Sequence, residues 1–329
     1  MPQRRLAATP QYFGWPNRVH AIIVVFIVHS REFTSMGFLK RIGLAAALLA
    51  CLIPAARAES ITLAVTDVGG MKKLQESFGP FKDALSKATG QEITLLPVET
   101  HTAALEALRA KKVDFLLTGP AEYVVIHKQT KARIVVGLLR PDYFATIVTL
   151  ADSPYRSVQD LKGTKIGLGD AGSTSRHLGP LQALADAGLN PLKDAKVVNF
   201  DTRTLWDALK RKEVAAIGMN NANFIAARKL EKKMGGLPPD AFRVIAHGPV
   251  LPSDVLVAGA HVDEQAVEKV RNAVSTHSDE LISAIVNGRG NKKYRGMRFV
   301  THVDDSDYDY VRSMYATAGY PEYDKFIGD

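Results

Sequence analysis

The chain has 329 residues, of which 46% are hydrophobic and 23% charged, as in an ordinary folded protein. Its 42 basic and 34 acidic residues give a formal net charge of +8, but the first 58 positions hold seven of the bases and one of the acids. The remainder, with 35 basic and 33 acidic residues, lacks the basic excess of a nucleic-acid-binding protein, so we expect no nucleic-acid partner. At this length we expect two domains.

Residues 36–58 have the pattern of a secretory signal peptide. A short basic segment at 36–41 precedes an apolar run at 42–53 that is too short to span a bilayer, and Ala-Arg-Ala at 56–58 is a small-residue cleavage site. We therefore expect the protein to be exported to the periplasm. Residues 1–35 are then an upstream extension, with Met36 and not Met1 as the true start.

Cys51 is the only cysteine, and it lies inside the predicted signal peptide. Its context, Leu-Leu-Ala-Cys at 48–51, also fits a lipoprotein cleavage box, which would leave a lipid-anchored protein. Because the apolar run continues past Cys51 and ends in a good cleavage site, we favour cleavage after Ala58. In either case the exported chain has no disulfide.

From residue 60 onward, short β-branched segments alternate with segments of helical periodicity, which is typical of α/β units on a largely parallel sheet. Glycines and prolines at the ends of the segments mark the turns. The predicted strands are 61–65, 93–98, 113–117, 132–139, 144–150, 165–168, 196–200, 214–219 and 242–247, and the predicted helices are 81–89, 102–110, 120–128, 175–187, 204–211, 223–234, 264–286 and 307–318. Apolar character resumes at 256–258.

This pattern predicts two lobes. The first lobe starts with residues 59–150, the second comprises residues 151–254, and residues 255–329 return to the first lobe and add the C-terminal helices. Two connecting segments would then form a hinge, with a ligand site in the cleft between the lobes. In open α/β sheets such sites lie beyond the carboxyl ends of the strands.

Residues 166–180 predict a buried strand that runs through glycines into a helix. Ser173, Thr174 and Ser175 fall at the N-cap and first turn of that helix, where hydroxyl groups and unpaired backbone N–H groups converge. The partial positive charge of a helix N-terminus favours an anion at this point. The alternative is that Ser173 only caps the helix.

Several segments, in this order and spacing, resemble the phosphonate-binding protein family of ABC importers over about residues 60–329. The resemblance implies a type II periplasmic binding protein fold, in which each lobe is a mixed, mainly parallel sheet flanked by helices. It also implies an extracytoplasmic solute-binding protein that closes on an anion and delivers it to an ABC permease in the inner membrane. The segments are Thr118-Gly-Pro-Ala-Glu-Tyr123, Leu161-Lys-Gly-Thr-Lys-Ile-Gly167, Asp170-Ala-Gly-Ser-Thr-Ser175, Leu178-Gly-Pro180, Ala187-Gly-Leu-Asn-Pro191 and Leu251-Pro-Ser-Asp254.

The resemblance also implies roles for individual residues. The Ser-Thr-Ser turn at 173–175 would hold phosphonate or phosphite oxygens, and Tyr123 would donate its phenol from the first lobe. Asp254 would accept a hydrogen bond from a protonated ligand oxygen or an amino group.

Two positions depart from the family pattern. His101 takes the place of a tyrosine before the first-lobe helix, and a family histidine of the second lobe falls near Thr202 or Arg203. These departures leave the organic part of the ligand open.

Other chemistries find little support in the sequence. The histidines show no paired metal-ligand spacing, and the Gly-x-Ser-x-Gly segment of a serine hydrolase is missing. We therefore expect no metal, no cofactor and no enzymatic activity, and a monomer that binds a small phosphonate-like oxyanion. The alternatives are a periplasmic sensing module coupled to a membrane sensor, and an importer component for another anion such as a sulfonate.

Overall fold

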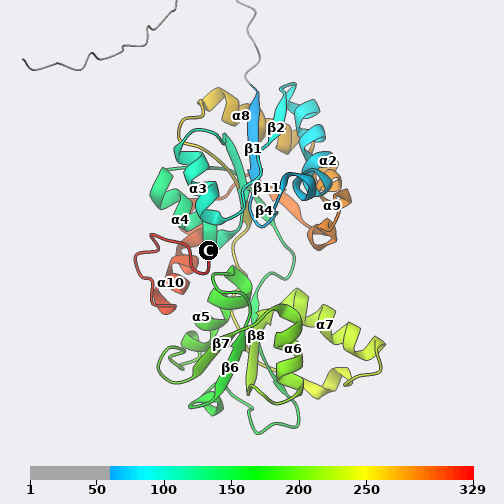
Figure 1. Ribbon diagram of the computed structural model, residues 1–329, viewed down its shortest axis with the longest axis vertical. Coiled ribbons are helices and arrows are strands. Elements are labelled where there is room, and N and C mark those ends of the chain that lie inside the picture. The colour runs from blue at the N-terminus through cyan, green and yellow to red at the C-terminus, as the bar shows by residue number, and fades with distance from the viewer. Residues whose placement is uncertain (1–59) are drawn as a thin grey trace, which may run out of the picture. The chain divides into compact units, whose positions relative to one another are not determined.

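The structure, a computed structural model, describes residues 60–329 (Figure 1). The predicted extension, the signal peptide and Cys51 all lie outside the described residues. Within residues 60–329 the chain forms two mixed β-sheets with helices packed on them, which confirms the predicted α/β fold.

The first lobe is built on a six-stranded sheet with the order β11-β4-β10-β3-β1-β2. Strands β1, β2 and β3 are parallel, whereas β10 runs antiparallel to both of its neighbours. The strands are β1 (Ile61–Val65), β2 (Ile93–Leu95), β3 (Phe115–Thr118), β4 (Arg133–Leu139), β10 (Asp254–Ala258) and β11 (Arg298–Val300), and the helices are α2 (Met71–Thr89), α3 (His101–Arg109), α4 (Pro120–Thr130), α8 (Glu264–Thr276), α9 (Ser278–Asn287), η4 (Asn291–Tyr294), η5 (Asp305–Tyr308) and α10 (Asp309–Thr317).

The second lobe is built on a five-stranded sheet with the order β7-β6-β8-β5-β9. Strand β6 is parallel to β7 and β8, and β5 is antiparallel to β8 and β9. The strands are β5 (Ala145–Leu150), β6 (Lys165–Leu168), β7 (Lys196–Asn199), β8 (Ala216–Asn220) and β9 (Phe242–His247), and the helices are η1 (Gln159–Leu161), η2 (Thr174–Leu178), α5 (Gly179–Asp186), α6 (Thr202–Lys210), α7 (Asn221–Lys233) and η3 (Pro239–Ala241).

The chain crosses between the sheets twice, at residues 140–144 and 248–253. The crossing segments are joined to each other, because Leu251 N–H donates to the Tyr143 carbonyl at 2.7 Å and Gly248 N–H donates to the Ala145 carbonyl at 3.0 Å. Strand β5 lies in the second sheet, so the first crossing comes before residue 145 and not after the predicted boundary at 150. An apolar strand pattern identifies a strand but not the sheet that it joins.

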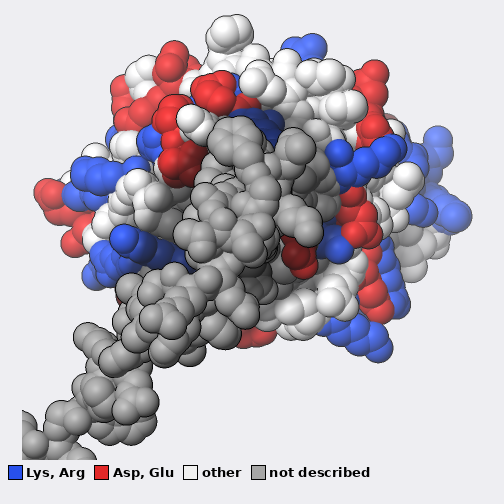
Figure 2. All heavy atoms as spheres, turned by 90° about the horizontal axis from the view of Figure 1, so that it is seen from above, with Lys and Arg blue, Asp and Glu red and all other residues white. Residues whose placement is uncertain are grey.

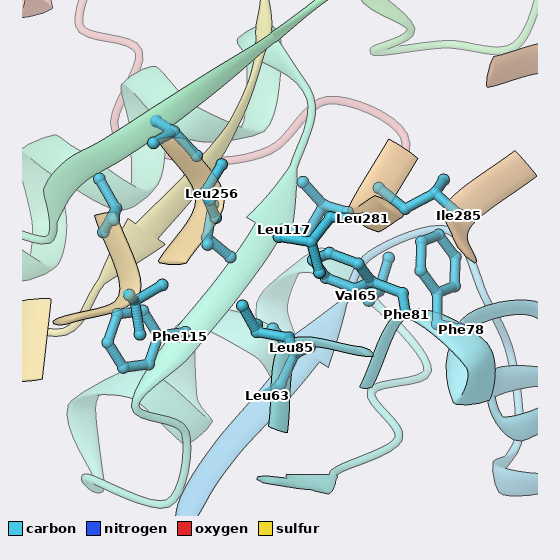
Figure 3. Packing of buried hydrophobic residues seen from close by; sticks show 14 of the residues in the cluster. Leu63, Val65, Phe78, Phe81, Leu85, Phe115, Leu117, Leu256, Leu281 and Ile285 are labelled. Carbon is cyan, nitrogen blue, oxygen red and sulfur yellow. The ribbon is translucent and has the colours of Figure 1, made fainter. Parts of the chain in front are cut away.

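The core of the first lobe shows why alternate strand residues are apolar. Leu63 and Val65 of β1 pack with α2, α8 and α9 on one face of the sheet (Figure 3), while Ala64 packs with α3, α4 and α10 on the other. A sheet covered on both faces needs apolar side chains at every position of its central strands, because successive side chains point to opposite faces. This explains the continuous apolar runs of β1 and β3.

Three helix predictions differ from the structure. Helix α2 begins at Met71 and passes through Pro80, whereas the prediction placed its start at residue 81. The predicted helix 264–286 is two helices that meet at His277. The predicted helix 175–187 opens with the π-helical turn η2. In each case side-chain periodicity located the helix but not the backbone irregularity, which tertiary packing decides.

Basic and acidic side chains are interspersed over the end of the first lobe that Figure 2 shows. This mixture agrees with the nearly neutral composition of the chain beyond residue 58. None of the helices within residues 60–329 has the length and apolar character that a bilayer span requires.

The buried ring of Phe78 allows a test of this core. Phe78 is fully buried on α2 and meets the Tyr294 ring edge-on, with the ring centroids 6.1 Å apart. We expect Phe78→Ala to lower the free energy of unfolding by about 3–5 kcal/mol, because the cavity it leaves cannot collapse fully. On the same helix Met71 is 39% exposed, and Met71→Ala should change stability by less than about 0.5 kcal/mol. Urea unfolding would measure both, and equal losses would contradict this packing.

Candidate functional site

The turn between β6 and α5 carries the predicted hydroxyl groups. Gly172 has a φ of +82°, and a Cβ atom there would lie 1.9 Å from the Ile327 carbonyl oxygen, so only glycine fits. The Ser173 carbonyl accepts from the N–H groups of His177 and Leu178, both at 3.0 Å, which closes the π-helical turn η2. Residues 173–175 are called the hydroxyl turn from here on.

The imidazole of His177 supports this turn as a neutral group. Its Nδ1 accepts from Gly172 N–H at 3.2 Å, and burial lowers the pKa of His177 to about 4. A ring that accepts a hydrogen bond at Nδ1 and stays uncharged fixes the loop without adding a positive charge to it.

Two of the three hydroxyl groups in this turn are buried and already serve as acceptors. Thr174 Oγ1 accepts from Ala121 N–H at 3.1 Å, and Ser175 Oγ accepts from Asn220 Nδ2 at 3.2 Å. Each hydroxyl group also carries a proton to donate. Within residues 60–329 these two bonds use only the oxygen lone pairs, so both O–H groups can donate to an anion.

A cavity of about 620 Å³ lies against the hydroxyl turn. Residues of both lobes line it, so it lies between them. Charged side chains are prominent in its wall, and they include Asp67, His101, Glu122, Arg140, Arg176 and Lys293.

Arg140 and Asp254 form an ion pair at the first-lobe side of this cavity. Arg140 Nε donates to Asp254 Oδ2 at 2.8 Å, and the guanidinium lies 4.4 Å from the centre of the Tyr143 ring. Asp254 is 5% exposed, and burial raises its pKa in spite of the opposing effect of Arg140. Its Oδ1 is buried and has no hydrogen-bond partner among residues 60–329. Arg140 lines the cavity, whereas Asp254 is outside its lining and contacts Arg140.

His101 and Glu122 form a second charged group in the wall. His101 Nε2 lies 3.1 Å from Asp67 Oδ1 and 3.8 Å from Glu122 Oε1. Burial opposes the charge on His101, but the nearby carboxylates of Asp67, Glu122 and Asp329 outweigh it and raise its pKa. Burial raises the pKa of Glu122 to about 7, although His101 opposes the shift.

The last residues of the chain contribute to the same region. Asp329 accepts through Oδ1 from His101 N–H at 2.8 Å and through Oδ2 from Thr102 N–H at 2.7 Å. The Asp329 side chain therefore satisfies the first N–H groups of α3 beside the cavity.

The structure brings together only part of the predicted site. Ser173, Thr174, Ser175 and His101 line the cavity, whereas Asp254 reaches it only through Arg140.

The side chain of Tyr123 points elsewhere. It is 1% exposed, donates its hydroxyl to Asp305 Oδ1 at 2.8 Å and packs on the Tyr308 ring. Successive residues of a helix are rotated by about 100°, so the neighbouring Glu122 faces the cavity in place of Tyr123. The tyrosine that does line the cavity is Tyr143.

Thr202 and Arg203 open helix α6 and are exposed outside the cavity lining. Thr202 Oγ1 accepts from Arg176 Nη1 at 3.1 Å, so it touches a lining residue without lining the cavity itself. Arg203 donates its backbone N–H to Asp201, the N-cap of α6.

Sequence reasoning missed Glu122, Arg140, Tyr143 and Lys293. Arg140 directly follows the buried strand β4, and the rule that ligands bind beyond the carboxyl ends of strands is a signal that could have identified it. Lys293 lies in η4, where nothing in the sequence marks it. Among the described residues no group of three or more His, Cys, Asp or Glu side chains could hold a metal ion.

A family model described as "ABC transporter, phosphonate, periplasmic substrate-binding protein" matches residues 64–308. Among solved structures, PhnD1 from Prochlorococcus marinus in complex with methylphosphonate has a TM-score of 0.60 at 16% identity, covering 80% of this chain and 99% of that one. The periplasmic aliphatic sulphonate binding protein SsuA from Escherichia coli has a TM-score of 0.52 at 17% identity, covering 82% and 90%. These likenesses confirm the two-lobed fold.

The curated tetrathionate sensor histidine kinase TtrS of Salmonella typhimurium is 27% identical over 158 residues. The match covers 45% of this chain but only 26% of the length of that kinase.

The buried carboxyl group of Glu122 predicts a pH effect on stability. Its pKa is about 7 in the folded protein and 4.5 as an ordinary side chain, so as pH rises between these values the unfolded state loses its proton first. Folding stability should therefore fall over this interval, by at most about 3 kcal/mol. Glu122→Gln should remove this part of the pH dependence, whereas Glu106→Gln on the exposed face of α3 should leave it. Unfolding midpoints of the three proteins measured from about pH 4 to pH 8 test this prediction. If the midpoints of Glu122→Gln and of the unmodified protein depend on pH in the same way, the prediction is wrong.

Proposed function

We propose a ligand for this chain on the premise that it belongs to the family of periplasmic substrate-binding proteins of phosphonate ABC transporters. The ligand is a small tetrahedral oxyanion, namely a phosphonate, phosphite or a close relative. It is captured in the cavity between the lobes without covalent chemistry and passed to an ABC permease.

The observation that carries this proposal is the hydroxyl turn. Two buried O–H groups, those of Thr174 and Ser175, have protons to donate at the same wall of one cavity. Arg140 and His101 add positive charge on the opposite, first-lobe side. Neutral donors from one lobe and cations from the other suit an anion with several oxygens, because each oxygen can accept more than one hydrogen bond.

These donors are sufficient for useful affinity. Hydrogen bonds to a charged group contribute about 1.5–3 kcal/mol each. Four of them contribute about 6–12 kcal/mol, and subtracting an association cost of about 4 kcal/mol from the upper value leaves about 8 kcal/mol, which corresponds to a micromolar Kd.

We propose that the lobes bend toward one another around the ligand through the two crossing segments. Ala121 of α4 and Thr174 of the hydroxyl turn are already joined by a hydrogen bond across the cavity margin. A ligand that bridges the two walls adds further bonds between the lobes and so favours the closed arrangement.

Replacing Ser175 tests the hydroxyl turn. Ser175 lies in the cavity wall and is only 6% exposed. Ser175→Asp places a negative charge at this position, where it repels an anion. We expect it to abolish the rise in Tm that methylphosphonate, aminoethylphosphonate or phosphite causes. Thr301→Asp adds the same charge at an exposed position outside the cavity lining and should keep that rise. If no phosphonate, phosphite, phosphate or sulfate raises the Tm of the unmodified protein, the proposed ligand class is wrong.

Two tyrosines separate the site seen in the structure from the one expected from sequence. Tyr143→Phe removes a hydroxyl from the cavity wall and should weaken methylphosphonate binding about 5- to 10-fold, the effect of losing one hydrogen bond of about 1–1.5 kcal/mol. Tyr123→Phe should leave the affinity unchanged and lower stability by about 1 kcal/mol, because it loses only the bond to Asp305. Calorimetric titration of both variants with methylphosphonate measures the two affinities. If Tyr123→Phe weakens binding and Tyr143→Phe does not, Tyr123 belongs to the site and Tyr143 does not.

A sensing role is the second candidate, and the match to a tetrathionate sensor kinase favours it. In that role the chain would bind a similar anion and report to a membrane sensor. Deleting the gene would distinguish the two. Loss of growth on a phosphonate as the sole phosphorus source indicates transport, whereas loss of a transcriptional response with normal growth indicates sensing. A sulfonate remains the alternative ligand class.

We also propose that residues 36–58 direct export and that the exported protein is a monomer. Mass spectrometry of the protein from the periplasm would show an N-terminus at Glu59. A mass that includes a lipid on Cys51 would contradict cleavage after Ala58. Light scattering would measure the oligomeric state.

A further inference from the structure

Glu122 lies in the first turn of α4, directly beside the hydroxyl turn. Its neighbour Ala121 donates its N–H to Thr174 Oγ1, and the Glu122 side chain lines the cavity while being 8% exposed. Within residues 60–329 no other residue donates a hydrogen bond to the Glu122 carboxyl group. Its nearest cation, His101 Nε2, lies 3.8 Å from Oε1, beyond hydrogen-bond distance. A ligand in the cavity can therefore supply a closer partner to this buried carboxyl group.

A second carboxyl group lies close to the same point. A Cβ atom on Gly119 would be 2.5 Å from Glu122 Oε2 and 3.9 Å from Asp254 Oδ1, so the two carboxyl groups flank this glycine. In the described part of the chain Asp254 Oδ1 is buried without a hydrogen-bond partner, while Oδ2 of the same group accepts from Arg140. The region around Gly119 is therefore rich in acceptor oxygens within a cavity that is otherwise suited to an anion.

The other charged groups that face Glu122 do not neutralise it. His101 Nε2 of α3 lies 3.8 Å from Glu122 Oε1. The same nitrogen lies closer, at 3.1 Å, to Oδ1 of Asp67, which follows β1. Asp67 and Asp254 both disfavour a negative charge on Glu122. Arg140 is engaged with Asp254. Lys293 and Arg176 line the cavity, and within residues 60–329 neither forms a hydrogen bond or ion pair with Glu122. Burial therefore dominates, and the carboxyl group holds its proton up to about neutral pH.

We propose that Glu122 selects the ligand by requiring one proton to be shared between its carboxyl group and the bound oxyanion. Anions that bring their own proton, such as phosphonate monoanions, are then favoured over sulfonates of the same shape. This inference rests on the proposed function and assigns the substrate class within it.

The selection follows from proton counting. A sulfonate stays fully ionised, so it can lie beside Glu122 only when the carboxyl group is protonated and donates to a sulfonate oxygen. A phosphonate monoanion has a P–O–H group that donates to the ionised carboxylate. Above the pKa of Glu122, sulfonate binding must therefore take up a proton from solution, whereas a phosphonate that is still a monoanion brings the proton with it. No covalent bond between heavy atoms changes in either case.

The matched ligands methylphosphonate and methanesulfonate test this inference. With the unmodified protein, the Kd of methanesulfonate should rise about tenfold per pH unit above about pH 7, while that of methylphosphonate changes less than about threefold up to about pH 8. The neighbouring carboxylates raise the pKa of His101 against the effect of burial, and a loss of its charge weakens both anions alike. The difference between the two profiles is therefore the quantity to measure.

In Glu122→Gln the Kd of methanesulfonate should depend on pH as weakly as the Kd of methylphosphonate. The preference for methylphosphonate over methanesulfonate should shrink about tenfold at about pH 8. Glu106→Gln, which removes an exposed carboxylate from α3, should keep the difference between the profiles. If Glu122→Gln does not fold, calorimetry of the unmodified protein in buffers of different ionisation enthalpy gives the proton uptake directly. At about pH 7, where about half of Glu122 is ionised and most of the methylphosphonate is still a monoanion, we expect an uptake of about half a proton for methanesulfonate and no uptake for methylphosphonate.

The binding measurements distinguish a failure of the proposed function from a failure of the role of Glu122. Binding of neither anion would overturn the proposed function, and with it this inference. Binding of both with parallel pH profiles, or a difference that persists in Glu122→Gln, would overturn the role of Glu122 and leave the proposed function standing.

Discussion

The desolvation of charged side chains in one cavity is the constraint on which the rest of the site depends. Glu122 and Asp254 are nearly inaccessible to water, and Arg140 is held beside them by Asp254. Removing charges from water costs several kcal/mol per ion unless partners replace the lost hydration. The wall therefore places acids beside bases, and the neutral hydroxyl groups of the other lobe add directed donors to the cations that line the cavity. A site built this way recognises an anion by directed hydrogen bonds more than by excess charge.

Sequence reasoning predicted the fold well because the fold depends on periodicity. Alternating β-branched and helical segments located nearly every strand and helix, and burial on both sheet faces explains why the central strands show no polar alternation. The assignment of β5 failed because sheet membership depends on pairing partners far away in sequence. The single predicted helix 264–286 failed at His277 because a break between two packed helices leaves the apolar periodicity almost unchanged.

The site was predictable where a local motif fixes the backbone, and less so where side-chain direction matters. The hydroxyl turn lies where a strand-glycine-helix pattern places it. The prediction for Tyr123 identified the correct helix turn but the wrong neighbour, because a shift of one residue on a helix turns the side chain from the cavity to the core. Arg140, Tyr143 and Lys293 come from three separate segments, and only tertiary structure brings such residues to one wall.

The ion pair between Arg140 and Asp254 also joins the two crossing segments, since Arg140 begins the first and Asp254 directly follows the second. Together with the backbone bond from Leu251 to Tyr143, it makes the pair of segments a short two-stranded ribbon at the point where they leave the first lobe. Arg140 is also part of the cavity wall. One side chain therefore both ties the two crossing segments together and borders the space where a ligand would lie, so a change at this position would affect the link between the lobes and the site at once.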